Sequence, residues 1–180
     1  MRHDSHVQRP HGQGIAYLVV TGGGGQLADG DQPRPGYTIS AVLRPHRAAD
    51  FYHLLYAWNT ALVLQVDKQG GGPARILSGD LILRHYLSDM RANDGGRAFF
   101  FGLGAGLSHA DWRTPAASAQ GSPTVGSADA PTFLAEFGLE WNLDPALVLM
   151  GKGQYRLYDR DGHDLSGWTL QAGAGLPLPF

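Results

Sequence analysis

Apolar side chains alternate with polar or small ones along eight segments of the chain, most of them about ten residues long. In the clearest segment, residues 97–111, Phe99 and Phe101 fall on one face and Gly102 and Gly104 on the other. A period of two residues predicts β-strands, because successive side chains of a strand point to opposite faces. The segments cover approximately residues 14–21, 36–44, 52–67, 75–87, 97–111, 132–142, 146–159 and 165–180.

The first segment predicts an apolar outer face made of Ile15, Tyr17 and Val19, and the run Gly22–Gly25 after it predicts a turn. The stretch 113–131 is rich in Ala, Ser, Gly and Pro and shows no period, so we expect a long loop there. Residues 1–12 are expected to form a flexible N-terminal tail, and residues 13–180 a single domain.

Eight amphipathic strands in succession predict an all-β fold, an eight-stranded antiparallel up-and-down transmembrane β-barrel. Lipid cannot satisfy backbone amides, so among sheets only a closed one can cross a bilayer. The apolar face would then contact lipid, and the polar face would fill a narrow lumen. The alternation alone also allows the inverse arrangement, a soluble lipocalin-like barrel that binds a small apolar ligand.

Charged residues recur on the face predicted to point inward. Glu136 and Glu140 share that face with Lys152 and Arg156 of the following segment, and pairing between these two neighbouring segments would neutralise charge inside the barrel. The expected lumen charge network consists of Asp80, Arg84, Glu136, Glu140, Lys152 and Arg156.

Aromatic residues near the segment ends predict girdles at the two membrane interfaces, where amphipathic rings are favoured. The expected interface residues are Tyr37, Tyr52, Trp58, Trp112, Trp141 and Trp168.

Composition narrows the possible chemistry. The 180 residues contain no cysteine and carry a formal net charge of −2, so thiol chemistry is excluded and nothing indicates a nucleic-acid partner. His3, His6 and His11 match no zinc-site spacing, and we expect neither a metal nor a cofactor. The polar start of the chain lacks the pattern of a secretory signal.

Two stretches resemble bacterial outer-membrane barrels. Residues 99–108 resemble the aromatic-then-glycine strand common in such barrels, and the final strand ending at Phe180 resembles their C-terminal assembly signal. Pro177 and Pro179 depart from that signal. The resemblance implies the outer membrane of a Gram-negative cell as location, contact with lipids including lipopolysaccharide, recognition by the barrel-assembly machinery, and a monomer.

One enzyme family of this architecture, the lipid A deacylases (acyloxyacyl hydrolases), carries a His-x-Ser pair on the penultimate strand. The corresponding place here is Gln154-Tyr155-Arg156, with Gln154 for the histidine and Arg156 for the serine. Glutamine cannot act as a general base and arginine cannot act as a nucleophile. The distant resemblance therefore implies a barrel without this activity.

Two other groups contain residue types used in hydrolysis. They are His85 with Ser88 and Asp89, and His109 with Asp111 and Ser108, and neither supplies a complete nucleophile, base and orienting group. The sequence thus favours a non-catalytic barrel with a structural, adhesion, or lipid- or partner-interaction role. A lipid A-modifying acyl hydrolase-like enzyme and the lipocalin-like barrel are the alternatives.

Overall fold

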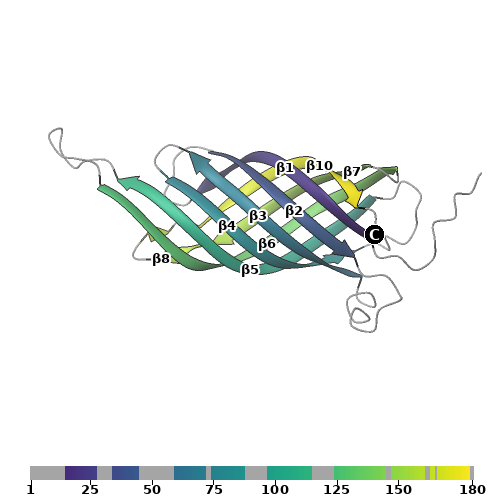
Figure 1. The fold of residues 1–180 in the computed structure, drawn as a ribbon, viewed down its shortest axis with the longest axis horizontal. Coiled ribbons are helices and arrows are strands. Elements are labelled where there is room, and N and C mark those ends of the chain that lie inside the picture. The colour runs from purple at the N-terminus through teal and green to yellow at the C-terminus, as the bar shows by residue number, and fades with distance from the viewer. Residues whose placement is uncertain are drawn as a thin grey trace, which may run out of the picture.

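The computed structural model shows a closed antiparallel barrel of eight strands, with a separate two-stranded hairpin (Figure 1). It describes residues 15–27, 34–44, 59–71, 74–87, 97–114, 124–144, 147–160, 163–164 and 166–178. The barrel strands are β1 (Ile15–Leu27), β2 (Arg34–Arg44), β3 (Thr60–Gly71), β4 (Ala74–Tyr86), β5 (Arg97–Thr114), β6 (Thr124–Asp144), β7 (Leu147–Leu157) and β10 (Gly167–Leu178). The small hairpin pairs β8 (Asp159–Arg160) with β9 (His163–Asp164).

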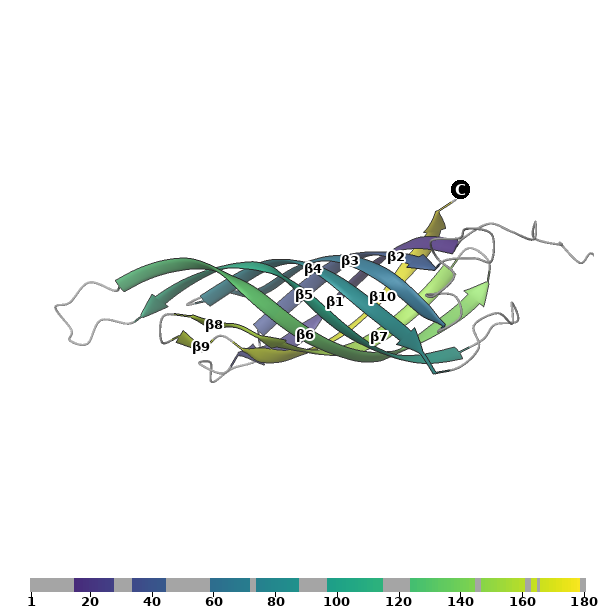
Figure 2. The ribbon, with the colours of Figure 1, turned by 90° about the horizontal axis from the view of Figure 1, so that it is seen from below.

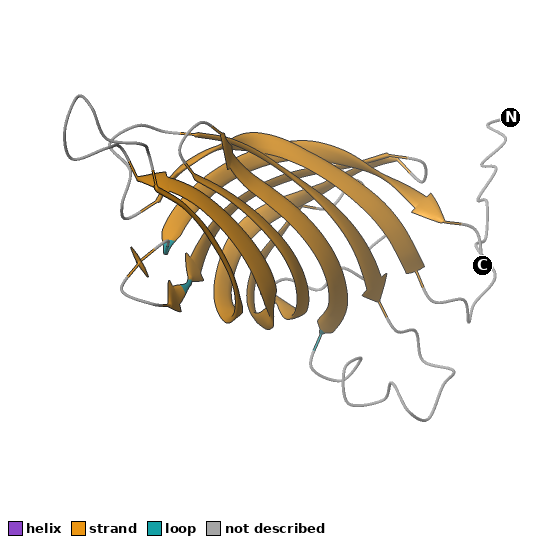
Figure 3. Cartoon of the chain, turned by 60° about the vertical axis from the view of Figure 1, so that its left-hand side comes forward, coloured by secondary structure: helices purple, strands orange, loops and turns teal. Residues whose placement is uncertain are grey.

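Each barrel strand pairs with the next barrel strand along the chain, and β1 pairs with β10 to close the barrel. Ala16 lies opposite Leu178, so the chain enters and leaves the barrel at the same end (Figure 3). We call this the terminal end and the other the hairpin end, because β5 and β6 extend there beyond the rest of the barrel (Figure 2). No helix among the described residues is long and apolar enough to span a membrane.

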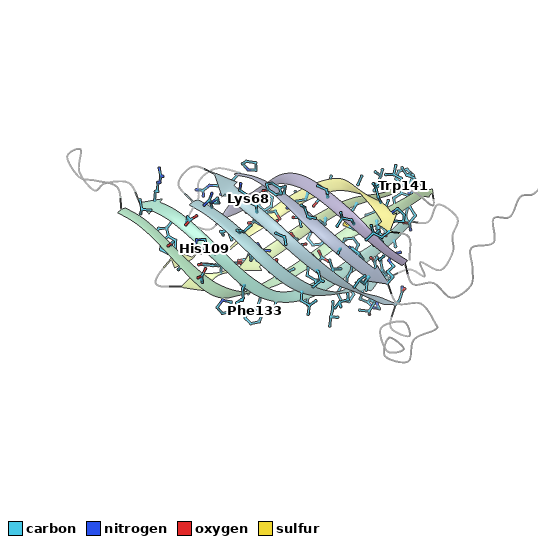
Figure 4. The ribbon with its side chains drawn as sticks, in the orientation of Figure 1. Lys68, His109, Phe133 and Trp141 are labelled. Carbon is cyan, nitrogen blue, oxygen red and sulfur yellow. The ribbon has the colours of Figure 1, made fainter. Side chains whose placement is uncertain are left out.

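The large apolar side chains of most strands point away from the barrel, as Phe133 does in Figure 4. Leu107 is 72% exposed and Phe133 61% exposed. On β5 this apolar belt runs from Phe99 to Leu107, about 26 Å along the strand and so about 20 Å across a bilayer at the usual tilt. The buried charged side chains, which lie inside the barrel, are Asp67, Asp80, Arg84, Glu136, Glu140, Lys152 and Arg156. The predicted transmembrane barrel is confirmed, and the lipocalin-like alternative is wrong because its apolar face would have to line the interior.

The predicted orientation of the first strand is wrong. Tyr17 and Val19 are buried in the lumen, whereas Leu18 and Val20 are exposed on the outside. Residues on both faces are apolar here, so the pattern alone could not distinguish the two orientations. Tyr17 differs from Leu18 in its hydroxyl, which donates a hydrogen bond to Glu140 in the lumen and so favours the inward orientation of Tyr17.

The predicted turn at Gly22–Gly25 is also wrong, because these residues continue β1 and pair with both β2 and β10. β1 approaches β10 so closely that a Cβ on Gly23 would lie 1.9 Å from the carbonyl oxygen of Leu170. Gly23 and Gly25, where a Cβ would lie 1.9 Å and 2.0 Å from a β10 carbonyl oxygen, are therefore required for the close approach of the two strand backbones.

The predicted loop at 113–131 is shorter than expected, since β5 continues to Thr114 and β6 begins at Thr124. The two strands remain paired up to their last residue pair, Thr114 opposite Thr124. This part of the hairpin lies beyond the apolar belt. Lipid therefore imposes no alternation on its sequence, and the backbone pairing could not be read from the side chains.

Candidate functional site

The lumen contains a network of ion pairs that joins strands across the barrel. Arg84 Nε lies 2.7 Å from Glu136 Oε1, and Lys152 Nζ lies 3.9 Å from the other oxygen of the same carboxylate. Arg156 contacts two carboxylates at once, Asp67 at 2.8 Å and Asp80 at 2.5 Å. All six of these side chains are almost completely buried.

All six residues of the expected charge network point into the lumen, and one of the pairings expected between the neighbouring strands β6 and β7 forms, that of Glu136 with Lys152. The other charges of these two strands have different partners. Arg156 bonds to β3 and β4 rather than to β6, and Glu140 pairs with Arg44 of β2. Sequence reasoning missed Arg44 and Asp67 as members, although their positions in the alternation place both on the inward face. Among the described residues, the lumen holds four cations (Arg44, Arg84, Lys152 and Arg156) and four anions (Asp67, Asp80, Glu136 and Glu140).

Neutral side chains complete the filling of the lumen. Tyr17 donates to Glu140 at 2.5 Å, and Tyr86 donates to the same oxygen at 3.0 Å. An apolar cluster that includes Val63 and Phe100 surrounds the Arg84 pair, and a second cluster around Ile76 closes the hairpin end. Arg84 has no exposed surface at all. The filled lumen leaves no open path along these described side chains.

Among the described residues considered for hydrolysis, His109 contacts Asp111, but no serine is brought to a histidine. Gln154 and Arg156 are buried in the lumen, whereas Tyr155 between them faces outward. Ser108 donates to Ser78 inside the barrel, while His109 is exposed on the outer surface. His85 lies against the ring of Phe101, and Ser88 and Asp89 lie outside the described residues.

Aromatic residues with neighbouring cations mark the two ends of the apolar belt (Figure 4). Lys68 Nζ lies 5.6 Å from the ring centre of Tyr37 at the hairpin end, and the Arg97 guanidinium lies 4.5 Å from that of Trp141 at the terminal end. Trp168 is also exposed on the outer wall.

Trp112 is placed differently from the expectation. It shares the inward-facing side of β5 and packs against the cluster around Ile76, with its ring over Gly126. The residue lies beyond the belt, where a large ring closes the end of the lumen. Tyr52, Trp58 and Phe180, like the N-terminal tail, lie outside the described residues.

Beyond the belt, the outer face of β4, β5 and β6 carries a row of charges. His109 Nδ1 lies 2.7 Å from Asp129, and its Nε2 lies 3.2 Å from Asp111, which Arg75 contacts at 2.6 Å. The hydrogen bond to Asp129 is the main cause that raises the pKa of His109 above its ordinary value. We call these four residues the charged row.

The same part of β6 has an unpaired edge. β7 pairs with β6 only from Phe133 onward, so residues 124–132 pair with β5 on one side and with no barrel strand on the other. Tyr158, which follows β7, donates its hydroxyl to the Ala128 carbonyl at 2.9 Å. We call residues 124–132 the open edge.

Comparison with solved structures gives the same architecture. Neisserial surface protein A superposes with a TM-score of 0.60 at 12% identity, over 93% of this chain and 97% of that one. The N-terminal β-barrel domain of Pseudomonas aeruginosa OprF gives 0.56 at 12% identity, over 92% and 100%. The outer membrane protein OprG from Pseudomonas aeruginosa gives 0.56 at 12% identity, over 94% and 99%.

No protein-family model matches the sequence, and neither does any curated protein. The structural likeness and the exposed apolar belt together define the class. The chain has the fold of an eight-stranded outer-membrane β-barrel.

Proposed function

We propose that this chain is a non-catalytic barrel of the outer membrane that presents the open edge of β6 to an extended segment of a partner protein. In the part of the chain that the structure describes, the filled lumen offers no path for a solute, and no serine lies beside a histidine that could activate it. The feature that suits a protein partner is the part of the β5–β6 hairpin that projects past the rest of the barrel (Figure 2).

The open edge supports this role through its backbone. An unpaired strand edge exposes N–H and C=O groups that can add a further strand, and main-chain hydrogen bonds then supply affinity with little demand on sequence. Its outward side chains include Val125, which is exposed, and Ser127. Asp129 and Pro131 near its base limit uncontrolled pairing, since charge and proline both discourage strand addition.

Adhesion of cells that display the barrel tests the proposal. The full chain, fused to an export signal, would be produced in a non-adherent Gram-negative strain, and bound cells would be counted on epithelial monolayers. We expect the double variant Val125→Lys and Ser127→Lys to reduce bound cells about tenfold, because lysine on an edge strand opposes strand addition. Equal surface levels would be verified by antibody labelling.

The matched control is Val125→Thr with Ser127→Thr, which keeps strand propensity and adds no charge. It should bind like the unchanged chain. Adhesion that is unaffected by the lysine pair, or no adhesion above empty cells, would reject a partner docked on this edge.

A further inference from the structure

The outer wall at the hairpin end combines two cations around a glycine. Tyr37, Lys68, Leu77 and His109 lie in one lateral row across β2 to β5, and Gly70 lies opposite Arg75 in the next row outward. Lys68 and Arg75 are therefore diagonal neighbours on adjacent strands, within reach of a shared ligand for side chains of this length. Gly70 contributes no side chain to the wall between them.

The two cations are held differently. Lys68 lies over the ring of Tyr37, which favours a cation on its face, and no ion pair joins Lys68 to an acid among the described residues. Arg75 contacts Asp111 through one terminal nitrogen, which leaves its other donors for a second acceptor. Both acids of the charged row lie on β5 and β6, so the β3–β4 side of this surface is locally positive.

The position of Lys68 and Arg75 relative to the apolar belt indicates which kind of anion they could bind. Val66 and Leu77, the outward residues next to Lys68 and Arg75 on the bilayer side, are both about half exposed and belong to the apolar belt. A ligand with acyl chains over these side chains would bring its headgroup to the two cations. Lysine and arginine together are suited to bind phosphate.

We propose that Lys68 and Arg75, with Gly70 between them, form a binding site for the phosphate of a membrane lipid headgroup in the leaflet at the hairpin end. The acyl chains of that lipid lie along Val66 and Leu77. This site is separate from the open edge, so the lipid-binding proposal does not depend on the proposed partner docking.

Lipid binding to the refolded full chain tests the site. The barrel would be placed in phosphatidylcholine nanodiscs, and diphosphoryl lipid A would be titrated in and its retention measured by native mass spectrometry. We expect Lys68→Gln with Arg75→Gln to weaken retention at least tenfold, because two charge-assisted contacts are removed. The conservative pair Lys68→Arg with Arg75→Lys should retain most of the binding.

The control variant is Arg113→Gln, which removes an exposed cation of the neighbouring strand β5, farther from the belt. Folding of every variant would be checked by its heat-dependent shift on a cold detergent gel. Unchanged lipid A retention in the double variant, or an equal loss in Arg113→Gln, would overturn the site. So would equally tight retention of lipid A stripped of phosphate, or full competition by millimolar inorganic phosphate, which would indicate a free-anion site.

Discussion

Arg156 contacts two buried carboxylates of the lumen at once, those of Asp67 and Asp80. A buried carboxylate without its cation is costly, so removing one partner of a buried ion pair typically costs about 3–5 kcal/mol. We expect Arg156→Met to lower the free energy of unfolding by about that amount, measured by urea titration in phosphatidylcholine vesicles with tryptophan fluorescence.

Two comparisons sharpen this prediction. Adding Asp67→Asn and Asp80→Asn to Arg156→Met should recover part of the loss, because the uncompensated charges are then gone. Arg75→Gln breaks an exposed pair and should cost less than about 1 kcal/mol. A loss for Arg156→Met as small as that for Arg75→Gln would contradict the role of the buried pairs.

At this scale the sequence predicted which charged residues face inward but, apart from Glu136 with Lys152, not which of them meet. The two-residue period places Asp80, Arg84, Glu136 and Arg156 on the face opposite the bulky apolar side chains, and the predicted membrane barrel makes that face the inner one. Their partners depend on how far each strand is shifted against the next around the closed barrel, and that stagger is not encoded in any one segment. Arg156 therefore meets β3 and β4 across the lumen.

Among the elements, β1 depends most on the absence of side chains. A Cβ on Gly23 would overlap the Leu170 carbonyl oxygen at 1.9 Å, whereas a Cβ on Gly22 would have no atom nearer than the Gly36 carbonyl oxygen at 4.0 Å. We therefore expect Gly23→Ala to reduce the refolded fraction severely and Gly22→Ala to leave it nearly unchanged. The heat-dependent gel shift measures both, and equal refolding of the two variants would show that the strands can separate at no cost.

The β5–β6 hairpin should respond to pH through His109. Its pKa is raised in the folded chain, chiefly by the hydrogen bond to Asp129. Protonated His109 thus stabilises the β5–β6 hairpin fully below the ordinary pKa of 6.5, and this stabilisation is lost as pH rises through the higher pKa of the folded chain. Amide hydrogen exchange at residues 125–129, corrected for intrinsic rates, should show more protection at about pH 6 than at about pH 9. His109→Gln should remove that difference, and a pH response that survives in this variant would assign it elsewhere.

Element type was predictable wherever lipid lies on one side of the strand. Residues 97–111 and 132–142 show the alternation because Phe101 and Phe137 must face hydrocarbon while their neighbours fill the lumen. The prediction failed for residues 124–131, which lie beyond the belt, and for β1, where Leu18 and Tyr17 are both large and apolar but face opposite ways. In each case the deciding force was backbone pairing or close approach, which leaves little trace in side-chain hydrophobicity.

For the whole molecule, the closing seam joins the first and last barrel strands, and glycines lie on both sides of it. A Cβ on Gly173 would lie 1.9 Å from the Val20 carbonyl oxygen, just as one on Gly23 would overlap β10. Joining β1 to β10 closes a loop that contains nearly the whole chain, which carries the largest entropic cost of any strand pairing here. The strand pairing with the largest entropic cost therefore forms at a seam where Gly23 and Gly173 let the two backbones approach each other without hindrance from a side chain.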